Sequence, residues 1–241
     1  MPKRFAFLLL AYAFSKNCSA QVIIDSAFYG GAANIIGTYY TTALGGQSPL
    51  YNGPEYIEYP FAIREGHPFF ESEQFTNGEI YFDGMIFHKV RLCYDLVKGQ
   101  VVIRDFNSIY KIVLPGDKIE QFTLFDHTFV RIQHDSLNQV KSGFYDQLCK
   151  GKIALFAKRE KKIIEKDEFP RMDIVVKSIN TYYIRKEGVY YNFKNKAGLL
   201  NILHDRKKEI LQYFKKNKIS FNDDSEKAMI AAVEYYNGLI N

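Results

Sequence analysis

The chain has 241 residues with a formal net charge of +5, and 16% of its residues are aromatic, with 20 Phe, 18 Tyr and no Trp. The length allows one or two domains, and the many Phe and Tyr side chains favour β-sheet. The charge argues against a nucleic-acid partner, because it falls to +2 without the basic residues of the first twenty positions, and such binding needs a clustered basic face.

The first twenty residues have the pattern of a secretion signal. Residues 2–4 include two bases, residues 5–14 are apolar, and small side chains end the stretch at Ala20. The apolar run is too short to cross a bilayer, which needs about 20 apolar residues. We therefore expect residues 1–20 to be a signal peptide cleaved between Ala20 and Gln21. No later apolar run approaches spanning length, so we expect a mature protein that is soluble or peripheral to a membrane.

Residues 21–53 are rich in Gly, Ala, Ser and Thr and show no clear periodicity. We predict an extended N-terminal arm, with one short strand near residues 35–40. Its glycines do not have the spacing of a phosphate-binding loop, so a nucleotide site is not indicated.

Residues 54–194 carry the signals of an antiparallel β body. Asp83-Gly84 stands between two apolar-aromatic runs and suits a type I′ hairpin turn, which needs positive φ at both central positions. Residues 90–96 alternate between two faces, and residues 109–114 predict a further strand. Turns this closely spaced exclude parallel βαβ crossovers, which need about a dozen residues per connection.

The second half of the β body continues the pattern. Residues 144–149 and 153–158 predict one hairpin, and residues 181–185 and 189–193 predict another. The charged residues 159–168 between them are expected to form an exposed strand extension or a loop. Adjacent tyrosines recur in this half, and since neighbouring strand residues point to opposite faces, one ring of each pair should lie outside. Such rings, if lined up, could stack on sugars or on a protein partner.

At about Lys194 the apolar period changes from two to about 3.6, so residues 195–241 predict helices packed on the β body. Asp223 and Glu226 have the spacing of a capping box before the last helix. The predicted fold class is α+β. It is an antiparallel β meander, as a curved sheet or partial barrel, closed by two or three C-terminal α-helices.

No catalytic, cofactor-binding or metal-binding motif is found. The histidines have no H-x-x-x-H or H-E-x-x-H spacing and no Cys-x-x-Cys beside them. They are His67, His88, His127, His134 and His204. Cys93 and Cys149 remain after the leader, and they are either a disulfide of an oxidising compartment or two separate, partly buried thiols.

Several stretches considered together carry a resemblance: residues 50–56, 66–70, 78–84, 90–103 and 143–159, with the C-terminal tail. The chain resembles a group of exported, functionally uncharacterised proteins common in Bacteroidetes-type Gram-negative bacteria. The resemblance implies a Gram-negative envelope setting and no catalytic residues. The sorting domain that sends many proteins of those bacteria to the cell surface is not apparent, which favours the periplasm or association with the outer membrane.

The leading hypothesis is a non-enzymatic periplasmic or outer-membrane-associated protein that binds another envelope component through its β body. One alternative is a carrier of a lipid or other apolar ligand in a β cavity. Another is a hydrolase of envelope polymers that would use acids such as Asp83, Asp95 or Asp126 in a cleft.

Overall fold

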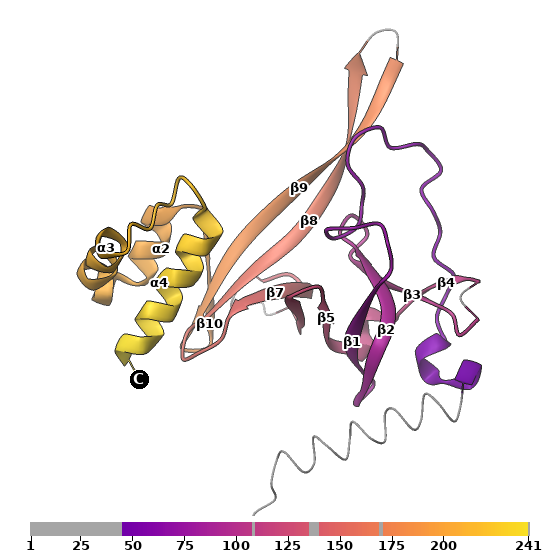
Figure 1. Cartoon of the computed structure of the whole chain (residues 1–241), viewed down its shortest axis with the longest axis horizontal. Helices are drawn as coiled ribbons and strands as arrows, with labels where there is room; N and C mark the ends of the chain where they lie inside the picture. The colour runs from indigo at the N-terminus through magenta and orange to yellow at the C-terminus, as the bar shows by residue number, and fades with distance from the viewer. Residues whose placement is uncertain (1–44, 108, 135–139, 169–170, 241) are drawn as a thin grey trace, which may run out of the picture.

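The structure is a computed structural model that describes residues 45–107, 109–134, 140–168 and 171–240. It confirms an α+β fold with an antiparallel sheet of ten strands in the order β10-β9-β8-β7-β6-β5-β1-β2-β3-β4, which is not closed into a barrel (Figure 1). From β1 to β10 the strands are Thr76–Phe82, Met85–Asp95, Gln100–Arg104, Lys111–Val113, Ile119–Leu124, His127–Ile132, Gly143–Cys149, Ala154–Glu168, Arg171–Lys186 and Val189–Phe193. Strands β1 to β4 form one meander, in which each strand pairs with the next. The chain then crosses back, so that β5 pairs with the free edge of β1 and β5 to β10 form a second meander.

The hairpin prediction at β1 and β2 is confirmed. Asp83 and Gly84 join the strands with φ of 51° and 78°, as a type I′ turn requires. The alternation in β2 is confirmed as well. Leu92 and Tyr94 enter the main core, a buried cluster fed by β1 to β7, whereas Cys93 joins a smaller cluster on the other face.

The end of the predicted arm is anchored to the sheet. Two 3₁₀ turns, Gly45–Gln47 and Pro49–Tyr51, precede β1, and Leu50 is buried in the main core. The C-terminal part of the predicted arm, from Gly45, is therefore folded against the sheet and is not extended. The predicted signal peptide with its Ala20–Gln21 cleavage site, and the strand expected near residues 35–40, lie outside the described residues.

The strands β8 and β9 form a long ribbon that projects beyond the rest of the sheet (Figure 1). They stay paired from Ala154 opposite Arg185 to Glu168 opposite Arg171, so the charged stretch 159–168 is a strand extension. The ribbon has local support, because Lys161 Nζ donates hydrogen bonds to the backbone carbonyls of two residues before β1. Residues 64–65 also pair with the backbone of β9.

Three helices follow β10: α2 (Lys196–Ile202), α3 (Lys207–Lys216) and α4 (Ser225–Ile240). They pack with β7 to β10 around a second core, whereas the main core lies at the β1–β7 end of the sheet. The predicted capping box was wrong by one position. Asp224 caps α4, since its Oδ1 accepts a hydrogen bond from Lys227 N at 3.0 Å, and Glu226 turns toward the sheet. No helix in the described part of the chain is long and apolar enough to cross a membrane.

Candidate functional site

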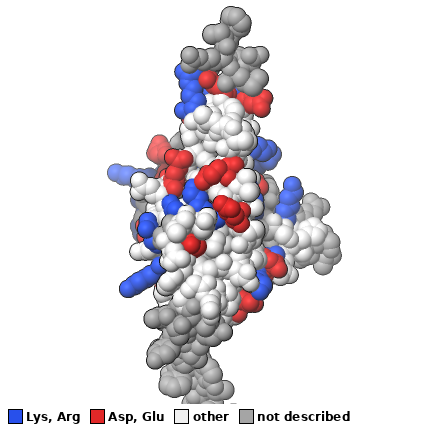
Figure 2. Space-filling view, turned by 90° about the vertical axis from the view of Figure 1, so that its right-hand side faces the viewer, with Lys and Arg blue, Asp and Glu red and all other residues white. Residues whose placement is uncertain are grey.

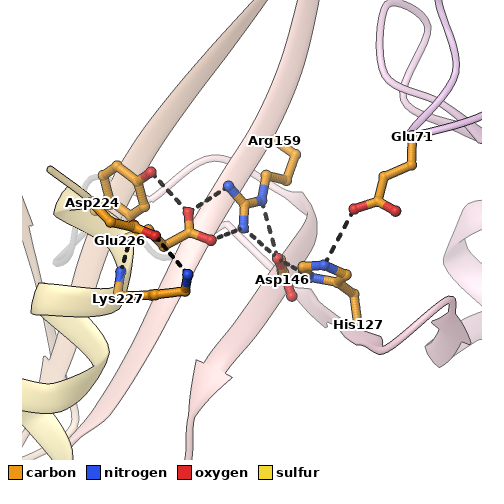
Figure 3. A network of polar contacts seen from close by, with 8 residues as sticks. Glu71, His127, Asp146, Arg159, Asp224, Glu226 and Lys227 are labelled. Carbon is orange, nitrogen blue, oxygen red and sulfur yellow. Dashed lines mark hydrogen bonds and ion pairs between the residues drawn. The ribbon is translucent and has the colours of Figure 1, made fainter.

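A connected network of polar side chains lies where α4 meets the sheet (Figure 3). Asp146 on β7 accepts hydrogen bonds from Arg159 Nε at 3.0 Å and Nη2 at 2.7 Å, both at Oδ2. The same guanidinium contacts Glu226 on α4 through Nη1 and Nη2, at 2.7 and 2.8 Å. The hydroxyl of Tyr182 on β9 also donates to Glu226, at 2.8 Å. We call this set of residues, together with His127, the Arg159 network.

The Arg159 network joins α4 to four strands, β6 to β9, and its central ion pair is hardly reached by water. The side chain of Asp146 is 1% exposed and that of Arg159 is 9% exposed. Burial acts to lower the pKa of Arg159, but the hydrogen bonds to Glu226 and Asp146 raise it overall, so the guanidinium stays charged. Buried charges of this kind are tolerated only where they are paired and hydrogen-bonded.

His127 on β6 is a titratable group of the network that is partly open to solvent, with its side chain 26% exposed. Its Nδ1 lies 2.7 Å from Asp146 Oδ2, and its Nε2 lies 3.5 Å from an oxygen of Glu71. The hydrogen bond to Asp146 raises the pKa of His127, although burial opposes the shift. An Asp–His pair can serve as a general base, but the other described contacts of this ring are the phenyl groups of Phe70 and Phe129. Among the described residues, these contacts link β6 to β7 and to the segment before β1.

Two of the three acids considered for a hydrolase, Asp83 and Asp95, have a local structural role. Asp83 lies in the β1–β2 turn, and Asp95 lies at the opposite end of β2. Asp95 is fully buried and accepts hydrogen bonds from the hydroxyls of Tyr56 and Tyr59 at 2.8 and 2.9 Å, which fixes the segment before β1. Asp126 is exposed in the β5–β6 turn.

Cys93 and Cys149 are free thiols, both buried, in two different clusters. The disulfide alternative is therefore not seen, and the alternative of two separate thiols describes them. Burial raises the pKa of Cys93 to about 12 and also raises the pKa of Cys149. Within the described ranges, no group of three or more His, Cys, Asp or Glu side chains could hold a metal ion.

The surface feature that stands apart is a group of exposed apolar side chains around the β3–β4 turn. Phe106, Ile109 and Tyr110 are 57, 65 and 58% exposed, and Ile57 is 73% exposed. Ile57 belongs to this group because residues 54–56 run antiparallel along β4 and lead toward the turn. We call these four residues the apolar corner.

Figure 2 looks at the end of the molecule that carries the β3–β4 turn. Charged side chains gather in the upper part of the described surface, and the part below them is largely uncharged. The strand predicted over residues 109–114 begins only at Lys111 in the structure, so Ile109 and Tyr110 lie before β4. Both side chains are free to point outward because they belong to the turn, which is why strand periodicity could not identify them.

Comparisons with protein-family models, with curated proteins and with solved structures found no match to this chain. The function must therefore be inferred from the chain itself.

Proposed function

We propose that the chain is an exported, non-catalytic protein of a Gram-negative cell envelope that binds another envelope protein through the apolar corner. The observation that carries the proposal is the exposure of four large apolar side chains at one end of the sheet. Scattered apolar residues are normal on a protein surface, but a grouped set marks an interaction site.

The apolar corner has the properties of a preorganised binding surface. Asp105 Oδ1 accepts hydrogen bonds from the backbone N–H groups of Ile109 and Tyr110, at 2.6 and 2.9 Å, so the turn is held before any partner arrives. The ring of Phe106 packs edge-on against Tyr51, with ring centroids 6.1 Å apart. Aromatic side chains are enriched at the centres of protein interfaces, and fully burying one large apolar side chain contributes about 1.5–3 kcal/mol.

The proposed location rests on the pattern of residues 1–20 and on the resemblance to exported proteins. Cell fractionation and N-terminal sequencing test it directly. We expect the protein in the periplasm or with the outer membrane, and a mature sequence that starts at Gln21. A product that stays in the cytoplasm with Met1 intact would contradict the location.

Binding is tested by photo-crosslinking in intact cells, with the crosslinker at Asn107 beside the apolar corner. The I109S/Y110S double variant should lose the crosslinked partner, because both side chains are removed while the backbone hydrogen bonds to Asp105 remain possible. Leu211→Ser is the matched control, since Leu211 is an exposed apolar residue on α3. Recovery of the same partner with the double variant would refute the role of the apolar corner.

The two alternative functions gain less support. The interior of the β1–β7 region is filled by packed rings, such as Phe122 stacked on Phe129 at 4.8 Å and Tyr94 against both, which does not favour a lipid carrier. The hydrolase hypothesis is not favoured either, because Asp83 and Asp95 are separated by the length of β2.

A further inference from the structure

A row of side chains crosses the sheet face opposite the main core. Tyr81 on β1 stands directly opposite Ile86 on β2 and Gln121 on β5, and Gln121 stands directly opposite Val130 on β6. Directly opposed residues point to the same face, so these four side chains form one row across four strands. Three strand spacings make the row about 14 Å long.

The row lies on the sheet face opposite the main core, and Val130 at its β6 end packs against a smaller buried cluster that includes Tyr145 and Phe156. Strand neighbours of its members, such as Ile80, Phe122 and Phe129, are buried in the main core. Side chains alternate along a strand, so Tyr81, Gln121 and their row partners project from the other face. The three described helices pack at the β7–β10 end of the sheet, away from this row.

The row forms the floor of a groove of about 510 Å³, within the size range of ligand sites. Its other lining residues include Asp117, Glu120, Arg131 and Gln133. The acids and the amide are exposed, and the side chains of the row other than Gln121 are half-buried. Arg131 Nη1 donates a hydrogen bond to the carbonyl of Gly116 at 2.6 Å, which fixes the guanidinium at the groove wall.

We propose that this groove binds a neutral oligosaccharide. The ring of Tyr81 and the aliphatic side chains suit the C–H faces of sugar rings, and the amides and carboxylates around them suit sugar hydroxyl groups. Two carboxylates against one guanidinium disfavour an acidic polymer. The polar wall disfavours a lipid, because an apolar ligand would leave these groups desolvated without hydrogen bonds. This site is separate from the apolar corner and does not depend on it.

Isothermal titration calorimetry with the mature chain and with cello-, manno- and chito-oligosaccharides tests the proposal. At least one of these neutral probes should bind the wild type. Tyr81→Ala should weaken that binding about tenfold or more, as loss of a central aromatic contact does, whereas Tyr81→Phe should retain it because the ring remains. Gln121→Ala should also weaken binding, and since Gln121 is exposed this variant should fold normally.

Tyr191→Ala is the matched control, because Tyr191 is an exposed tyrosine on the distant strand β10. It should bind as the wild type does, and so should the I109S/Y110S variant of the apolar corner. The melting temperature of each variant separates loss of binding from loss of folding. Three outcomes would overturn the proposal: no binding of any neutral probe, unchanged binding by both Tyr81→Ala and Gln121→Ala, or tighter binding of acidic alginate oligosaccharides.

Discussion

Replacing Arg159 with methionine should destabilise the protein by about 3–5 kcal/mol, because removal of one partner from a buried ion pair leaves the other charge buried and uncompensated. The guanidinium makes hydrogen bonds to Asp146 and Glu226 at 2.7 to 3.0 Å. In the variant the carboxylate of Asp146, 1% exposed, loses both guanidinium hydrogen bonds and is left with the side chain of His127, 2.7 Å away, which carries a compensating charge only when it is protonated. For a chain of this size, the loss corresponds to a fall in melting temperature of roughly 6–20 °C.

Urea denaturation of the mature protein, followed by circular dichroism, measures the change. Arg206→Met is the control, because Arg206 pairs with Glu209 at 3.4 Å on the surface, and such a pair contributes at most about 1 kcal/mol. Adding Asp146→Asn to Arg159→Met should restore part of the stability, since it removes the stranded charge. The reasoning is refuted if Arg159→Met costs no more than Arg206→Met.

Three further predictions concern His127, the two cysteines and Asn237. The hydrogen bond to Asp146 raises the pKa of His127 above its ordinary value of 6.5. The stabilisation from protonated His127 is therefore fully present below about pH 6.5 and is lost as the pH rises through the raised pKa. The stability advantage of the wild type over His127→Gln should shrink as the pH rises above about 6.5, and an advantage that stays constant with pH would contradict this. Because burial raises the pKa values of Cys93 and Cys149, the native protein should react slowly with Ellman's reagent, and a rapid reaction would contradict this. The denatured mature protein should show two reactive thiols, or three if the leader with Cys18 is retained. Asn237→Ala should lower the free energy of unfolding by about 2–4 kcal/mol in chemical denaturation. The buried side chain of Asn237 accepts a hydrogen bond from Ile153 N at 3.0 Å and donates one to Ile153 O at 2.9 Å, and the variant leaves both backbone groups without this partner. A loss below about 1 kcal/mol would show that these two hydrogen bonds are dispensable.

Local chemistry made the strands and turns predictable. Asp83 and Gly84 both adopt positive φ at low energetic cost, so two adjacent residues are enough to predict the first hairpin. The alternation around Leu92 and the helical period after Lys194 likewise depend on near neighbours. The misplaced cap, at Asp224 rather than Asp223, shows the limit of this information. Both acids have the right chemistry, and the contact between Glu226 and Arg159 is consistent with the register that the helix adopts.

The Arg159 network could not be read from the sequence in the same way. Arg159 lies in a run of alternating charges that is typical of a solvated strand, and its partners are 13 and 67 positions away. The row of Tyr81, Gln121 and Val130 could not be predicted from the sequence either, because it depends on the order and register of the strands. The general expectation that tyrosines line up on a sheet face could be stated from the sequence, but the particular residues could not.

Turn dipeptides, alternation and helical period act over a few residues, so they alone define an antiparallel β body followed by helices. Which strands become neighbours is decided in the folded chain, where β5 crosses back to β1 and α4 docks on β7 and β8. Burial and pairing of charge also arise there, because a side chain loses its water only when distant segments close over it. The candidate surfaces belong to this second level: the apolar corner, the groove and the Arg159 network each join residues that the chain keeps far apart.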